Sequence, residues 1–96
     1  MGRSPIHPGE QLADELQELG MSAAELARQI DVPVNRVTGI INGQRAITAD
    51  TDLRLARYFG MSEGFFLGLQ ADFDLMQCRR AIGPVLKTIK PRKRAA

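Results

Sequence analysis

Residues 22–45 have the sequence SAAELARQIDVPVNRVTGIINGQR, and the prediction of the fold starts from this stretch. Ser22 is followed three positions later by Glu25, the pattern of a capping box, in which each side chain binds the other residue's backbone N–H. A helix is therefore predicted to begin at this point. Leu26, Ala27 and Ile30 recur at helical spacing and give that helix one apolar face.

A second helix is predicted directly after the first. The run Asp31-Val32-Pro33 interrupts the first helix, and Pro33 suits the first turn of a new one because the N–H that proline lacks is unpaired there in any case. Two short helices joined by a tight turn, each apolar on one side, are the pattern of a helix-turn-helix. Asn42-Gly43 ends the second helix, whose apolar residues are Val34, Val37, Ile40 and Ile41.

The outward face of this second helix favours a DNA-binding motif over an ordinary αα-hairpin, which periodicity alone does not distinguish. It presents an amide, a guanidinium, a hydroxyl and a bare backbone, from Asn35, Arg36, Thr38 and Gly39. Acidic side chains are absent from residues 32–49, as a surface that approaches phosphates requires. On physical grounds the sequence favours DNA binding, and a purely structural hairpin is the alternative.

The residues on both sides of this helix-turn-helix resemble those of a known family. From Glu25 the chain continues as ELARQIDVPVNRVTGIINGQRAITADTDLRLARYFGMSEGFFLGLQADFDL, and near its start it contains IHPGEQLADEL. Over about residues 6–77 it resembles the HigA/VapI-type antitoxins, antidote proteins of plasmid maintenance with a lambda-repressor-like helix-turn-helix. The segment ITAD, followed by RLARYFG and a helix with paired aromatic residues, is more specific than a generic helix-turn-helix.

This resemblance implies an all-α fold, a five-helix lambda-repressor-like helix-turn-helix domain with a short basic C-terminal extension. It also implies a homodimer that binds a palindromic operator in double-stranded DNA, represses its own toxin–antitoxin operon and binds a cognate toxin, a small basic protein. Two alternatives remain open. One is a stand-alone helix-turn-helix repressor without a toxin partner, and the other is a protein-interaction module with a repurposed helix-turn-helix.

Length and composition agree with one small domain of 96 residues, of which 44% are hydrophobic and 25% charged. No apolar run approaches the length of a membrane span, the N-terminus lacks the apolar core of a signal peptide, and the lone Cys78 fits a reducing compartment. We therefore expect a cytoplasmic protein. His7 and Cys78 do not have the number or spacing of a zinc site, and no phosphate-binding loop is present. We expect no metal, no cofactor and no enzymatic activity.

The net charge of +2 is distributed unevenly along the chain. Residues 1–78 hold six basic and eleven acidic side chains, a net charge of −5, whereas residues 79–96 hold seven basic and no acidic ones, a net charge of +7. The pI of about 9.1 therefore reports a basic tail and not a basic helix-turn-helix face.

Two more helices are predicted beside the central pair. Residues 8–19 form the first helix of the chain, which begins at Pro8 and ends at a Gly20 cap. Thr48 caps the fourth helix, which Gly60 closes. The residues predicted to face inward are Leu12, Leu16 and Leu19 in the first helix and Leu53, Ala56 and Phe59 in the fourth.

The fifth helix is predicted to begin with Ser62 as its cap and to run to about Ala81, because Gly83-Pro84 should break it. This divides the chain into a helix-turn-helix and dimerisation domain of residues 1–81 and a basic tail of residues 82–96. A wide apolar stripe on the fifth helix predicts a two-fold dimer interface, with a core role inside the single chain as the alternative. The stripe consists of Phe65, Phe66, Leu69, Phe73 and Met76.

The DNA contacts are predicted from the third helix and its surroundings. Asn35 is the first choice for a base contact, because its amide can pair bidentately with adenine, and Arg36 is the second, as a guanine reader or a phosphate clamp. The predicted base-contacting set is Val34, Asn35, Arg36, Thr38 and Gly39. The predicted phosphate-contacting set is Ser22, Arg28, Asn42, Gln44 and Arg45.

The toxin is predicted to bind the acidic face of the first helix. Glu10, Asp14 and Glu18 recur every four residues and so line one stripe. A small basic toxin, which the resemblance implies, would be repelled by the basic tail, and the helix-turn-helix face is needed for DNA. The alternative is a solvated face that keeps the protein soluble.

Overall fold

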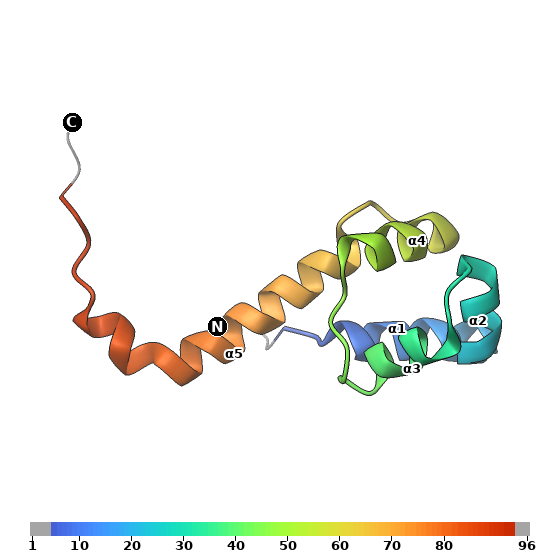
Figure 1. Cartoon of the computed structure of the whole chain (residues 1–96), viewed down its shortest axis with the longest axis horizontal. Helices are drawn as coiled ribbons and strands as arrows, with labels where there is room; N and C mark the ends of the chain where they lie inside the picture. The colour runs from blue at the N-terminus through green and yellow to red at the C-terminus, as the bar shows by residue number, and fades with distance from the viewer. Residues whose placement is uncertain (1–4, 94–96) are drawn as a thin grey trace.

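Five helices make up the part of the chain that the computed structural model describes, residues 5–93. They are α1 (Pro8–Leu19), α2 (Ala23–Ile30), α3 (Val34–Ile41), α4 (Ala49–Phe59) and α5 (Phe65–Thr88). These described residues contain no strand, so the predicted all-α fold with five helices is confirmed. Figure 1 shows α1 to α4 gathered into one body, from which α5 runs away. Within residues 5–93, no helix is long and apolar enough to cross a membrane.

The ends of α1, α2 and α4 follow local sequence signals. Ser22 Oγ accepts from the Glu25 N–H at 3.1 Å and Glu25 Oε1 accepts from the Ser22 N–H at 2.9 Å, so the predicted capping box of α2 is confirmed. The Ser22 backbone N–H favours the charged carboxylate and lowers the pKa of Glu25. Gly20 and Gly60 adopt the left-handed conformation, with φ of 61° and 69°, and end α1 and α4 as predicted.

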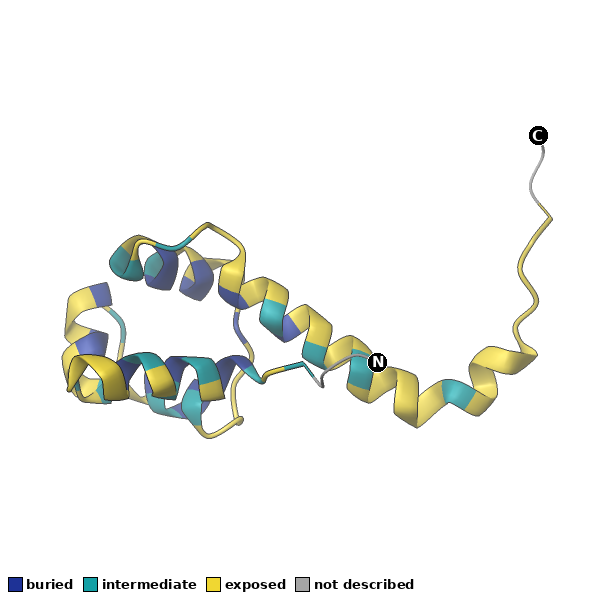
Figure 2. Ribbon diagram, turned by 180° about the vertical axis from the view of Figure 1, so that it is seen from behind, coloured by how far each residue is buried: buried dark blue, intermediate teal, exposed yellow. Residues whose placement is uncertain are grey.

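The core lies where α1 to α4 meet the first turns of α5, and Figure 2 shows the buried residues lining the inner sides of these helices. Two residues predicted to face inward are exposed, Leu19 by 55% and Leu53 by 48%, so these predictions are wrong. Leu19 is the last residue of α1, where the chain turns away, and α4 buries Asp52 and Leu55 in place of Leu53. The buried cluster consists of Leu12, Leu16, Leu26, Ala27, Ile30, Val37, Ile40, Ile47, Leu55 and Phe66.

The start of α5 differs from the prediction. Gly64, with φ of 93°, precedes the first helical residue, and Ser62 lies in the turn before it. The buried Asp52 carboxylate accepts from the Gly64 N–H at 2.6 Å and from the Leu67 N–H at 2.9 Å. Because unpaired N–H groups at a helix start attract an acceptor with negative charge, Asp52 on α4 takes the capping role predicted for Ser62.

The predicted break at Gly83-Pro84 is also wrong, because α5 continues through Pro84 to Thr88. A proline inside a helix removes one hydrogen bond and bends the helix, and Figure 1 shows α5 changing direction in its C-terminal part. The helix crosses the boundary predicted between residues 81 and 82, and the division into a domain and a tail stays a prediction. Residues 94–96 of that tail lie outside the described residues.

Candidate nucleic-acid interface

The helix-turn-helix is formed by α2, a three-residue turn and α3. Asp31 ends α2 in the left-handed conformation, with φ of 59°, and the Val32 N–H donates to the Ala27 carbonyl at 3.0 Å. Pro33 then precedes the first residue of α3. A residue other than glycine at positive φ requires support from its surroundings.

Arg54 on α4 supplies that support. Its Nη1 donates to the Ile30 carbonyl at 2.8 Å and to the Asp31 carbonyl at 3.2 Å, so a cation binds the last carbonyls of α2. Its Nε donates to both carboxylate oxygens of Asp50, each at 2.9 Å. This hydrogen bond raises the pKa of Arg54 and, as its largest cause, lowers the pKa of Asp50. No local sequence pattern predicts this role of Arg54, since its carbonyl partners lie 23 and 24 residues earlier.

One side of α3 is buried and the other is open. Val37 and Ile40 are each 1% exposed, whereas Val34 is 47% exposed and Asn35 is exposed on the outward side. Thr38 is half-buried and its Oγ1 donates to the Val34 carbonyl at 3.3 Å. The outward side therefore offers an amide, an aliphatic side chain and a partly engaged hydroxyl, the groups that read base edges.

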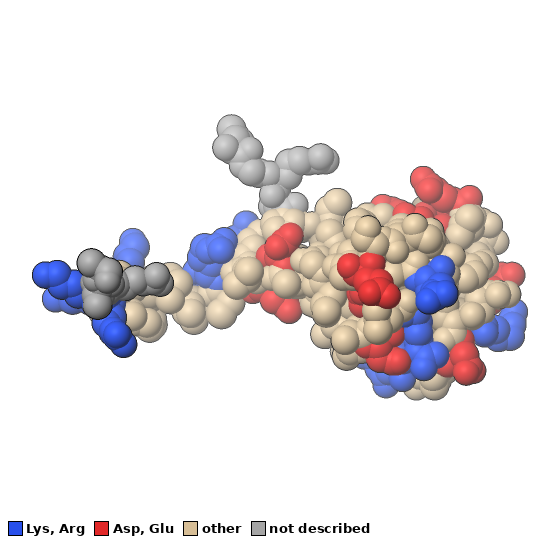
Figure 3. Space-filling view, turned by 90° about the horizontal axis from the view of Figure 1, so that it is seen from above, with Lys and Arg blue, Asp and Glu red and all other residues tan. Residues whose placement is uncertain are grey.

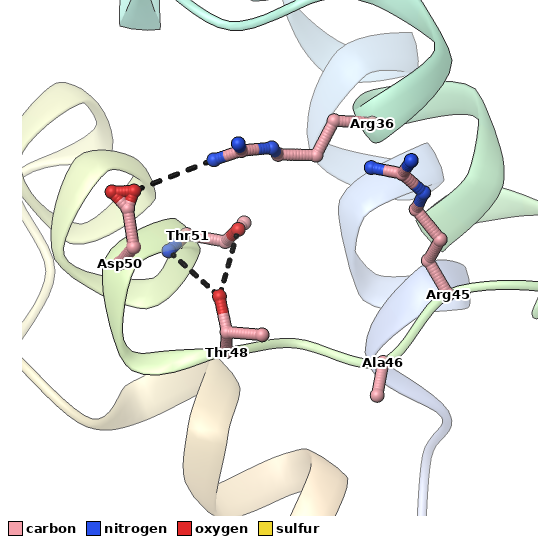
Figure 4. Close-up of a pocket in the computed structure, with 6 residues that line it drawn as sticks. All are labelled: Arg36, Arg45, Ala46, Thr48, Asp50 and Thr51. Carbon is pink, nitrogen blue, oxygen red and sulfur yellow. Dashed lines mark hydrogen bonds and ion pairs between the residues drawn. The ribbon is translucent and has the colours of Figure 1, made fainter.

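Arg36 leans from α3 towards α4. Its Nη1 lies 3.3 Å from Asp50 Oδ2, so Asp50 joins Arg36 to Arg54. Figure 4 shows the Arg36 side chain crossing to Asp50, with Arg45 at the other side of the same pocket. The pocket has a volume of about 460 Å³ and is lined by Arg36, Arg45, Ala46, Thr48, Asp50 and Thr51. It places two guanidinium groups, those of Arg36 and Arg45, next to α3.

Gly39 does not occupy the position predicted for it. It is buried, and a Cβ at this position would lie 3.0 Å from Arg45 Cγ and Cδ. The prediction that Gly39 exposes bare backbone to a base is therefore wrong, because the aliphatic part of Arg45 covers it. Gly39 instead lets the loop after α3 fold back, and its carbonyl accepts from the Gln44 and Arg45 N–H groups at 2.8 and 3.0 Å.

A second glycine fixes α3 against α1. Gly9, in the first turn of α1, packs so closely that an added Cβ would overlap the Ile40 carbonyl oxygen. His7 holds this turn, because its Nδ1 accepts from the Gly9 N–H at 2.9 Å and its ring meets the Phe73 ring edge-on at 4.8 Å between centroids. The C-terminal end of α3 is thus positioned by close backbone packing that requires glycine.

The predicted phosphate-contacting residues are all exposed, and their roles stay predictions. Ser22 uses its N–H and its hydroxyl oxygen within the capping box, which leaves its hydroxyl proton to donate. Arg28 lies on α2 and Asn42 follows the last residue of α3. Gln44 and Arg45 lie in the loop before α4.

The stripe predicted as a dimer interface lies on the body-facing side of α5. Phe66 is 0% exposed, so its assignment to an interface is wrong: it fills the core of the single chain. Leu69 packs against that core, and the Phe73 ring meets the His7 ring edge-on. Phe65 is 38% exposed and Met76 is half-buried. A core role inside the chain was the alternative, and for Phe66 it holds.

The acidic residues of α1 are placed as the helical spacing predicts. Glu10, Asp14 and Glu18 are all exposed. Gln11 Nε2 donates to Glu15 Oε1 at 3.1 Å beside them. The role of this surface in toxin binding stays a prediction.

Gln70 is a buried polar residue whose role the sequence did not predict. It is 8% exposed, and its Oε1 accepts from the Ile47 N–H at 3.0 Å while its Nε2 donates to Asp74 Oδ1 at 2.9 Å. It holds the loop between α3 and α4 on α5. Its partner Ile47 lies 23 residues away, so no local sequence pattern predicts this hydrogen bond.

Comparison with known proteins identifies the family to which this chain is similar. A helix-turn-helix family model matches residues 12–66, more than half of the chain. Virulence-associated protein I of Dichelobacter nodosus is 48% identical over 71 residues, which cover 73% of this chain and 66% of that relative. The chain thus spans just under two thirds of that relative's length.

Two solved structures are similar over nearly the whole chain. An addiction module antidote protein of the HigA family from Coxiella burnetii has a TM-score of 0.88 and 48% identity, covering 94% of this chain and 100% of that one. Pseudomonas aeruginosa antitoxin HigA, solved with the higBA promoter, has a TM-score of 0.86 and 42% identity, covering 93% and 99%. Proteins of this kind are regulators and antitoxins and not enzymes. The resemblance seen in the sequence is therefore confirmed, and the chain belongs to the helix-turn-helix family of HigA-type antitoxins.

Proposed function

We propose that this chain is an antitoxin that binds the operator of its own operon as a homodimer, represses that operon and neutralises a cognate toxin. The DNA-binding part rests on the exposure of the outward side of α3. Its buried side packs against α1 and α2, so these two helices fix the position of the exposed Val34 and Asn35. A structure at 42% identity, antitoxin HigA of Pseudomonas aeruginosa, was solved with the higBA promoter, which supports DNA binding by this chain.

In this proposal α3 enters the major groove and α2 crosses the phosphate backbone. Asn35 pairs with adenine through its amide, and Val34 and Thr38 lie beside it for thymine methyl groups. Arg45, exposed in the loop after α3, binds a phosphate. Two such surfaces related by a two-fold axis would bind a palindrome whose half-sites lie about 34–36 Å apart.

Arg36 has two roles available, as a guanine reader or as a phosphate clamp, and for either role it must leave Asp50. In the free chain its guanidinium lies 3.3 Å from the Asp50 carboxylate. Contact with guanine requires it to leave Asp50, which keeps its two bonds from Arg54. Since half of the Asp50 side chain is exposed, water screens this ion pair and the release costs little. Asp50 thus holds Arg36 towards α4 until a base or phosphate replaces the carboxylate.

The DNA-binding part is tested with Asn35→Ala and Arg45→Ala in titrations of operator DNA and random DNA at several salt concentrations. Asn35→Ala should weaken operator binding by about 1–3 kcal/mol and leave random DNA binding nearly unchanged. Arg45→Ala should weaken both DNAs alike and reduce the salt dependence by about one phosphate contact. Gln29→Ala, an exposed α2 residue outside the predicted contact sets, is the control. An unchanged ratio of operator to random affinity in Asn35→Ala would contradict the base-reading role.

The toxin-binding part is supported by the exposed carboxylates of Glu10, Asp14 and Glu18. They would steer a small basic toxin and pair with its arginines, with more effect on the association rate and specificity than on affinity. A variant with all three changed to Lys should lose neutralisation of the toxin encoded next to this gene and keep operator binding. The neutral variant Glu10→Gln, Asp14→Asn, Glu18→Gln separates lost attraction from new repulsion. Unchanged neutralisation with an unchanged association rate at low salt would remove α1 as the toxin surface.

A further inference from the structure

Asp50 lies between two arginines, and it does not bind them equally. Arg54 donates its Nε to both carboxylate oxygens at 2.9 Å, whereas Arg36 reaches only Oδ2, through Nη1 at 3.3 Å. The hydrogen bond from Arg54 is also the largest cause of the lowered pKa of Asp50, and the contribution of Arg36 is smaller. Arg54 is therefore the principal partner of this carboxylate, and Arg36 is the secondary one.

The two arginines border different surfaces of the body. Arg36 and Asp50 line the pocket between α3 and α4 that Figure 4 shows. Arg54 instead lines a second pocket, of about 440 Å³, between the end of α2 and α4. None of the residues that line this second pocket belongs to the predicted DNA-contacting sets. Figure 3 shows that basic and acidic groups lie next to each other on the surface of the body, so charge alone does not mark a DNA-binding surface.

We propose that Arg54 is a positioning residue for the DNA contact of Arg36, because it keeps the Asp50 carboxylate occupied. This inference rests on the proposed function and deepens it, since it names a residue away from α3 that determines how readily Arg36 binds DNA. Arg54 itself does not touch DNA in this proposal.

Arg54 lowers the cost of releasing Arg36. A guanidinium group has five N–H donors and can bind a carboxylate through two parallel hydrogen bonds. Without Arg54, both oxygens of Asp50 would be available to Arg36, and this pair would change from one hydrogen bond to two. With Arg54 in place, Arg36 gives up a single contact of 3.3 Å, and Asp50 keeps a positive partner after Arg36 has left.

The position of Arg54 is fixed from two sides. Its Nη1 donates to the Ile30 and Asp31 carbonyls at 2.8 and 3.2 Å, so the end of α2 holds the guanidinium group against α4. Asp50 and Arg54 lie four residues apart on α4, where side chains are neighbours on one helix face. A planar guanidinium group can bind the carbonyls and the carboxylate at once, which the point charge of a lysine does less well.

The first test measures, by fluorescence anisotropy, the affinity of the full chain for a duplex from the region upstream of its gene, with a random duplex as reference. Arg54→Gln should weaken binding to the upstream duplex by about tenfold, the effect of losing one arginine contact, because Asp50 then withdraws Arg36. Adding Asp50→Asn should restore most of this loss, since a neutral amide binds Arg36 weakly. Circular dichroism checks that the variants keep the helical fold.

Two controls separate this mechanism from a general loss of charge. In the Arg36→Ala background, Arg54→Gln should have almost no further effect, whereas a loss caused by charge at a distance would remain. Arg57→Gln removes the same charge from an exposed position three residues further along α4 and should leave the affinity nearly unchanged, because salt screens it. A shift of the turn between α2 and α3 would not be reversed by Asp50→Asn. A folded Arg54→Gln variant with wild-type affinity would overturn the inference.

The second test needs no DNA. The carboxyl ¹³C chemical shift of Asp50, followed through an acid titration of the free chain, gives its pKa in the wild type and in the variants. Arg54→Gln should raise this pKa more than Arg36→Ala does, and a larger rise in Arg36→Ala would overturn the order of partners on which the inference rests.

The two tests distinguish this inference from the proposed function. A wild type that does not prefer the upstream duplex to random DNA would refute the proposed function, and the titration would still decide which arginine is the principal partner of Asp50. A wild type that does prefer the upstream duplex, with a loss in Arg54→Gln that Asp50→Asn does not reverse, would refute this inference alone.

Discussion

Replacing Asp52 by alanine should destabilise the chain strongly, because this carboxylate joins α4 to α5. It is 2% exposed and accepts two backbone N–H groups, at 2.6 Å from Gly64 and 2.9 Å from Leu67. A hydrogen bond to a charged group contributes about 1.5–3 kcal/mol, so the loss of two has a gross cost of about 3–6 kcal/mol. Gly64 and Leu67 are exposed, so water reaches the freed N–H groups and we expect the lower end, about 3 kcal/mol.

The assay is thermal unfolding followed by circular dichroism at one protein concentration, because dimerisation makes Tm depend on concentration. For a domain of this size, a loss of about 3 kcal/mol lowers Tm by about 12–24 °C. Asp50→Ala is the matched control: it removes a carboxylate from the same first turn of α4, so the loss of the helix-dipole contribution is similar, but this carboxylate is half exposed. A Tm for Asp52→Ala close to that of Asp50→Ala would refute the capping role.

Two further predictions follow from the packing and the charges. Gly9→Ala should destabilise the fold by about 1–3 kcal/mol in urea unfolding, because its Cβ would overlap the Ile40 carbonyl oxygen, and Gly83→Ala, where a Cβ meets nothing, should not. The lowered pKa of Asp50 means that its ion pairs stabilise the fold above the ordinary aspartate pKa of 3.8 and that this contribution is lost as the pH falls through the folded-state pKa. Between pH 5 and 3, the Tm of Asp50→Asn should therefore fall less than the Tm of the wild type. An equal fall of Tm in the two proteins would contradict this prediction.

Predictions from the sequence succeeded where the interaction is local. The capping box of Ser22 and Glu25 and the glycine ends at Gly20 and Gly60 involve residues within five positions of one another. Their geometry follows from the backbone of a single helix end, so a short pattern is enough to predict it. The spacing of apolar residues likewise predicted the buried Val37 and Ile40 of α3.

The errors lie where distant residues compete with a local signal. Ser62 has the composition of a helix cap, but Asp52, twelve residues from Gly64, binds the N–H groups that a cap would bind. Leu53 has helical spacing with Ala56, but α4 turns its Asp52 and Leu55 side inward to hold α5. Pro84 was expected to end α5, yet it removes only one of the backbone hydrogen bonds of a 24-residue helix.

Local sequence signals were enough to predict α1 to α4, the helix-turn-helix and the outward position of Asn35, because helical periodicity and end signals act over three or four residues. The contacts that hold this motif in place became visible only in the fold, since they join different segments of the chain: Arg54 binds the α2 carbonyls, Asp50 binds Arg36, and Arg45 covers Gly39. It also decided which side of α5 is free. Both sides of that helix are apolar in the sequence, and the packing of the body covers one of them and leaves the other exposed.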